Sequence, residues 1–139
     1  MGGDIRAGIR AAVGEVVESY ELYSLNFVLG ELGHIWVFRY PEHNPLHMLR
    51  RGPGGDADGA VDHADSAGTM RLHYEDGDTP MVVVASEPIS EEPGWEEIAS
   101  GELIHIGPDL VVDRETIVAG PPEHPMLLNH RAAKSQSYA

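Results

Sequence analysis

A serine and a glutamate that end an apolar run are the residues of this sequence most suggestive of chemistry. Residues 82–85 read VVVA and lead directly into Ser86 and Glu87. Ser86 lacks the Gly-x-Ser-x-Gly setting of an activated nucleophile, and nothing in the sequence pairs it with a base. A hydroxyl here commonly bonds the backbone where a strand ends. Glu87 has three open roles: capping the next turn, pairing with Arg39, or pointing into a pocket.

Histidines are the second group of chemically capable residues, and the chain has 8 of them but no cysteine. His43 and His47 are four apart in a proline-containing stretch rather than on a helix, and His63 and His73 lack metal-ligand spacing. The missing cysteine excludes disulfides, cysteine metal sites and cysteine nucleophiles. We expect loop histidines without a metal, and no cofactor.

Two further motifs fall in the glycine- and aspartate-rich middle of the chain. Residues 56–59 read DADG and resemble the start of a calcium loop, but position 12 of that loop falls on Ala67 instead of glutamate. The Gly68-Thr69 step has the form of a self-cleavage junction that would expose a threonine. A single species at 15.1 kDa in an intact-mass measurement would rule that cleavage out.

Hydrophobic periodicity predicts the elements that must position these residues. Residues 4–20 form an amphipathic helix with Asp4 as N-cap and a stripe that includes Ile9, Val13 and Val16. Runs rich in β-branched and aromatic residues predict six strands, at 24–29, 34–40, 70–75, 81–85, 102–106 and 110–112. We expect these strands to pair as consecutive antiparallel hairpins, and Trp36 and Trp95 to be packing residues. The fold class is therefore α+β: mainly antiparallel sheet with one long N-terminal helix.

The 139 residues are expected to form one domain over 1–118 and a C-terminal tail over 119–139. Within the domain, residues 41–69 lack a sustained period and predict a long, mobile loop.

The net charge of −14 disfavours binding to nucleic acid or to an anionic membrane surface. No apolar run is long enough to span a bilayer, and the first residues have no secretory pattern, so we expect a cytoplasmic protein.

The order LNFVL, HIWVFRY, LHY, VVVASEPI and PGWEEIASGELIHI resembles the second half of class II glutamine amidotransferases. The likeness is greatest to the stand-alone bacterial branch that includes the ergothioneine-pathway amidotransferase. It covers roughly residues 5–112 and includes a GW-x-x-I-x-x-G-x-L stretch, with Gly94, Trp95, Ile98, Gly101 and Leu103 at its fixed positions.

The resemblance implies half of an N-terminal-nucleophile hydrolase fold, in which two stacked antiparallel sheets lie between helical layers. It also implies hydrolysis of the glutamine amide by an N-terminal cysteine, with release of ammonia. Ser86, Glu87 and Arg39 would then be pocket-wall residues of the glutamine site, and the loop that carries Trp95 would close over the sheet edge.

The departure from the family is the catalytic half, since the chain has neither the cysteine nor the asparagine and histidine motifs that accompany it. We expect the isolated chain to be inactive and to need a partner, either a polypeptide with the cysteine half or a second copy of itself. The alternative is a non-catalytic binding or regulatory module on the same scaffold.

Overall fold

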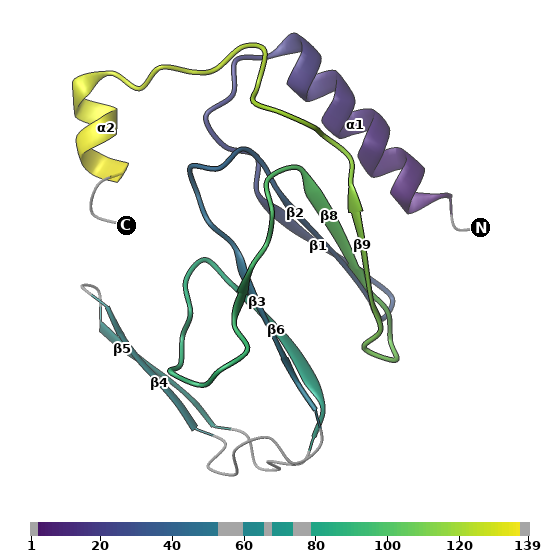
Figure 1. Ribbon diagram of the computed structural model, residues 1–139, viewed down its shortest axis with the longest axis vertical. Helices are drawn as coiled ribbons and strands as arrows, with labels where there is room; N and C mark the ends of the chain where they lie inside the picture. Colours follow the sequence, from purple (N-terminus) through teal and green to yellow (C-terminus); the bar gives the residue numbers. More distant parts are fainter. Residues whose placement is uncertain (1–2, 53–59, 66–67, 74–78, 137–139) are drawn as a thin grey trace.

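A helix and two antiparallel sheets form three successive layers in the computed structural model, which describes residues 3–52, 60–65, 68–73 and 79–136 (Figure 1). The first sheet has the order β1-β2-β8-β9, with bounds Phe27–Glu31, His34–Arg39, Glu102–Ile106 and Val112–Thr116. The second has the order β6-β3-β7, with bounds Met81–Ala85, His47–Arg51 and Glu96–Glu97. A separate hairpin joins β4 (Ala60–Asp65) to β5 (Gly68–His73). The expected α+β class with antiparallel sheets is confirmed.

Helix α1 (Ile5–Ser19) forms where the periodicity predicts it. The Asp4 side chain accepts a hydrogen bond of 3.0 Å from the backbone N–H of Ala7, which satisfies one of the free donors of the first turn. Ile9 and Val13 face the first sheet and are buried. The apolar stripe therefore holds α1 on the sheet.

The strands β1 and β2 form the predicted hairpin. Their register pairs Phe27 with Phe38 and Glu31 with His34. The two connecting residues, Leu32 and Gly33, both have positive φ, at 33° and 85°. That conformation matches the twist of a two-residue hairpin turn.

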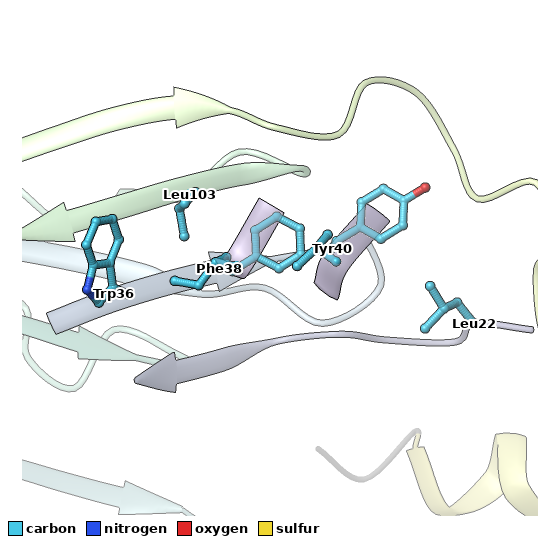
Figure 2. Packing of buried hydrophobic residues seen from close by; sticks show 7 residues of the cluster. Leu22, Trp36, Phe38, Tyr40 and Leu103 are labelled. Carbon is cyan, nitrogen blue, oxygen red and sulfur yellow. The ribbon is translucent and has the colours of Figure 1, made fainter. Parts of the chain in front are cut away.

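Central strands β2 and β8 are buried on both faces, so adjacent residues belong to different cores. Phe38 and Leu103 face α1, in the cluster shown in Figure 2, where Trp36, Phe38 and Tyr40 succeed one another along β2. Val37 and Ile104 face the second sheet. Between the two sheets they pack with Met48. One pair of strands thus joins the helix–sheet core to the sheet–sheet core.

The prediction of a loop over residues 41–69 was wrong where the structure is described. This stretch contains β3, β4 and the start of β5. The β3 segment reads HMLRR and has no β-branched residue, so composition gave no signal for a strand. Its strand conformation depends on partners distant in sequence.

The predicted hairpin between 70–75 and 81–85 was also wrong. β5 pairs with β4, and β6 pairs with β3 in the register Met48 to Val84. Burial of Met48 and Val84 against the first sheet favours this pairing over the shorter connection.

The pairing of the last two strands is confirmed, but the second of them lies further along the chain, since β9 runs from 112 to 116 rather than from 110 to 112. Beyond it, the segment predicted as a tail is anchored. Leu22 donates a 2.8 Å hydrogen bond to the carbonyl of His124 and accepts one of 2.9 Å from Met126. The short helix α2 (His130–Gln136) comes next. Neither helix within the described ranges has the length and apolar character needed to cross a bilayer.

Candidate functional site

A cavity of about 560 Å³ opens where β3 begins and β6 ends. Antiparallel pairing sets His47, the first residue of β3, opposite Ala85, the last of β6. Ser86 and Glu87 therefore leave the sheet at the end where β3 begins. The cavity is lined by Tyr23, Asn26, His43, Asn44, Pro45, Leu46, His47, Ser86 and Glu87. The structure therefore brings the two sequence-predicted residues, Ser86 and Glu87, into one mixed polar and apolar pocket.

Asn26 fixes one wall of the cavity. Its Nδ2 donates a 2.8 Å hydrogen bond to the carbonyl of Asn44, and its Oδ1 accepts one of 3.1 Å from the N–H of Tyr40. Both ends of the amide are used in these bonds. Asn26 thus fastens the segment after β2 to the segment before β1, and we assign it a positioning role.

Two rings form another part of the wall. The side chains of Tyr23 and His43 stack with a centroid separation of 5.0 Å and an interplanar angle of 4°. A flat aromatic surface of this kind can pack against the apolar or planar part of a small molecule.

His47 presents the least satisfied polar atom of the site. Its Nδ1 is buried without a hydrogen-bond partner, although the side chain as a whole is only half-buried. A buried nitrogen without a partner lowers the stability of the fold. With the Glu87 carboxylate, His47 gives the cavity groups for both donors and acceptors.

Arg39 does not line this cavity, and its place in the wall of a glutamine site stays a prediction. The Nη1 of Arg39 lies 2.6 Å from the Oε1 of Glu97. Arg39, which the sequence suggested as a partner of Glu87, therefore forms an ion pair with Glu97. The guanidinium also donates hydrogen bonds to the carbonyls of Ile98, Glu42 and Asn44, at 2.5, 2.8 and 3.2 Å.

The side chain of Arg39 borders a neighbouring cavity of about 460 Å³ together with Glu42 and Glu97. Because its bonds hold the carbonyls of Glu42 and Asn44, it shapes the segment that walls the first cavity. Arg39 therefore acts on the site through the backbone.

The loop that carries Trp95 packs on β3, where Gly94 lies against the side chain of Leu49. Trp95 donates a 3.0 Å hydrogen bond from Nε1 to the hydroxyl of Ser90, and Arg51 of β3 pairs with Glu92. Under this loop Leu49 is only 4% exposed. The prediction that Trp36 is a packing residue is confirmed by its place in the core.

A pair of histidines on the neighbouring strands β2 and β8 was not predicted from the sequence. His34 Nδ1 and His105 Nε2 lie 2.9 Å apart, in a cavity of about 370 Å³ that Asp109 and Asp113 also line. Burial lowers the pKa of His105, and the nearby His34 and Arg6 lower it further, against the opposing pull of Asp113 and Asp109. The register of strands 34–40 and 102–106 could have revealed the pair.

No cluster of three or more histidine or acidic side chains suited to a metal ion occurs within the described part of the chain. His43 and His47 instead line the first cavity. Residues 56–59 and Ala67, considered for calcium, lie outside the described residues, and so do the side chains of His63 and His73. Gly68 and Thr69 are part of strand β5, and the cleavage hypothesis stays a prediction.

Comparison with known proteins gives no match: no protein-family model fits the chain, and neither a curated protein nor a solved structure is significantly similar to it.

Proposed function

We propose that this chain is a scaffold half of a class II glutamine amidotransferase, which supports hydrolysis of the glutamine amide only with a polypeptide that carries the N-terminal cysteine half. The observation that carries the proposal is the cavity at the end of β6, where Ser86 and Glu87 meet a polar wall. The layering of α1 and two antiparallel sheets is compatible with half of that fold.

The chemistry of the cavity suits an amino-acid ligand. Glu87 supplies a carboxylate that can receive an ammonium group, and Asn26 and Asn44 lie on the polar part of the cavity wall. The chain has no cysteine to attack an amide. In the proposal, this half binds and orients glutamine while the nucleophile comes from the partner.

The test is a glutaminase assay on the chain alone and on the chain co-expressed with the cysteine-bearing half. The reading frame immediately upstream is the first candidate for that half. We expect no turnover above background alone, and turnover in the complex. Glutamine turnover by the isolated, cysteine-free chain would contradict the proposal, as would a stable complex that remains inactive.

A charge-neutral variant tests the role of Glu87 within the complex. Glu87→Gln should lower kcat/KM by about tenfold or more, because a charged hydrogen bond contributes roughly 1.5–3 kcal/mol. Glu91→Gln is the matched control, since Glu91 is exposed and does not line the cavity. Equal activity of the two variants would remove Glu87 from the site.

The alternative is a non-catalytic binding or regulatory module on the same scaffold, and the mixed polar and apolar lining of this cavity supports it. It predicts saturable binding of a small polar ligand, such as glutamine, by the isolated chain. Titration followed by amide chemical shifts at Ser86 and Glu87 distinguishes the two functions, provided that the co-expressed complex is assayed in parallel.

A further inference from the structure

Helix α1 covers only part of the sheet on which it lies. Four strands at about 4.8 Å spacing make a sheet roughly 15–20 Å wide with its side chains, whereas one helix is about 10 Å across. Arg6 and Arg10 form ion pairs with Asp113 and Glu115 of β9, at 2.5 to 3.1 Å. These pairs hold α1 toward the β9 edge, and at the opposite edge Leu29 of β1 is exposed.

The uncovered part is an apolar groove of about 350 Å³ between α1 and β1. None of its lining residues is charged: they are Ile9, Ala12, Val13, Val16, Leu25, Phe27, Val28 and Leu29. Leu29 lies opposite Trp36, on the α1 side of the sheet, and is 42% exposed. A continuous apolar surface of this kind at the edge of a sheet marks an interaction site.

We propose that this groove binds an amphipathic helix with basic flanks from a second polypeptide, which packs beside α1 and over β1. The inference goes beyond the proposed function, because it says how a partner is held and not what the complex does. The α1 wall of the groove has the spacing of a helix–helix contact, at positions 9, 12, 13 and 16.

Small residues on the same side of α1 allow the second helix to approach closely. Ala12 lines the groove, and Gly8 precedes it by one turn. A Cβ placed on Gly8 would meet no atom within 4 Å, so the space beside it is open. Helices that pack side by side have axes about 8–10 Å apart, and small residues favour the shorter distances.

Charge decides which partner fits. Glu31 ends β1, and helical spacing puts Glu15 on the flank of α1 beyond Ala12, opposite the Arg6 and Arg10 side. The chain as a whole has a net charge of −14. A partner helix with lysine or arginine beside its apolar stripe therefore complements this surface.

A second copy of the chain fits less well, because it brings the same negative charge. Its α1 is held over its own sheet by Arg6 and Arg10, so joining two β1 edges would set two grooves side by side and fill neither.

The experiment measures binding of a fluorescein-labelled synthetic helix to the full chain by anisotropy. The peptide has about 18 residues, enough for a helix to form in water, with leucines at i, i+3, i+4 and i+7 and lysines beside them. A scrambled peptide of the same composition and a version with glutamates in place of the lysines are the controls for the peptide.

Two neighbouring alanines provide matched protein variants. Ala12→Glu puts a charge in the groove and should weaken binding by at least about tenfold. Ala11→Glu adds the same charge to an exposed residue that does not line the groove, and should bind like the unmodified chain. Leu29→Gln is a second groove variant outside the helix, and circular dichroism confirms that each variant is folded.

Three results would overturn the inference. One is equal binding of the scrambled and patterned peptides, which would show that charge alone attracts them. Another is unchanged affinity for both Ala12→Glu and Leu29→Gln. The third is a dimer of the unmodified chain in sedimentation that Ala12→Glu dissociates, which would make a second copy the occupant.

Discussion

Among single residues, Arg39 does the most to define the walls around the candidate site. Its side chain is almost fully buried and bonds one carboxylate and three backbone carbonyls. A buried cation with this many partners is costly to remove, since the acceptors are left unsatisfied. The residue therefore couples the stability of the fold to the shape of the cavity.

Replacement of Arg39 by alanine should lower the free energy of unfolding by about 3 kcal/mol, measured by urea denaturation. Arg50→Ala is the control, because Arg50 is an exposed cation on the nearby strand β3. If the two variants lost equal stability, the account of Arg39 would fail.

The histidine pair predicts how stability depends on pH. Since the pKa of His105 is lowered by folding, the unfolded chain takes up a proton before the folded chain does. The contribution of His105 to the free energy of unfolding is fully present above about pH 6.5, the ordinary pKa of histidine. It is lost as the pH falls from there toward the lower pKa that His105 has in the folded chain.

His105→Gln should therefore flatten the stability profile below about pH 6.5, the side of the ordinary histidine pKa on which the loss occurs. Chemical denaturation at several pH values measures this. His130→Gln, at an exposed position in α2, should keep the slope. An unchanged slope in His105→Gln would refute the assignment.

At the residue scale, the sequence revealed side chains at the end of a strand but not side chains that meet across strands. Ser86 and Glu87 were found because an apolar run leads into them. The role of Arg39 could not be predicted, because its partners near residues 42–44 and 97–98 converge only in the folded chain. The pairing of His34 with His105 needed a register that no single segment contains.

At the scale of elements, strands rich in β-branched or apolar residues were predicted. Strands whose conformation depends on pairing with neighbouring strands were not. β6 and β8 match the predicted bounds, because β6 is an apolar run with three valines and β8 contains a leucine and two isoleucines. β3 has a methionine, a leucine and two arginines, and it becomes a strand by lying between β6 and β7. Local propensity gives way here to non-local pairing.

Gly101 is the turn position on which the β8 element depends. Its φ is +78°, and a Cβ placed there would lie 1.8 Å from the carbonyl oxygen of Val118. The carbonyl of Gly101 also accepts hydrogen bonds from Ile117 and Val118. The chain after β9 therefore passes too close for any side chain.

Gly101→Ala should destabilise the protein by about 3 kcal/mol or more, because backbone strain and a steric clash add. Gly14→Ala is the matched change in a helix with open space around it, and should stabilise by up to about 1 kcal/mol. Thermal unfolding of both variants tests the prediction. A Gly101→Ala protein as stable as the parent would contradict it.

For the molecule as a whole, the shared strands β2 and β8 make one cooperative unit of two cores. Each core loses one wall if these strands separate, since adjacent residues such as Val37 and Phe38 face different layers. Layers joined in this way should unfold together. The α+β class was predictable from the residues, but the strand that forms the centre of the second sheet was not, because β3 has no local strand signal.

The two tryptophans test this cooperativity, because Trp36 lies in the helix–sheet core and Trp95 in the loop over β3. Trp36→Phe and Trp95→Phe leave one fluorescent reporter each. Unfolding monitored by Trp95 in the first variant and by Trp36 in the second should agree with the circular dichroism midpoint of the same protein. Distinct midpoints for the two probes would show that the cores separate.

The contacts of Leu22 with His124 and Met126 bear on how the protein is made. During synthesis α1 and the β1–β2 hairpin leave the ribosome about a hundred residues before the segment that fastens them. Until β8 emerges, β2 has an open edge and Phe38 lacks its neighbour Leu103. The nascent chain thus carries an incomplete sheet while the residues between β2 and β8 are synthesised, when a chaperone that shields exposed apolar surface would matter most.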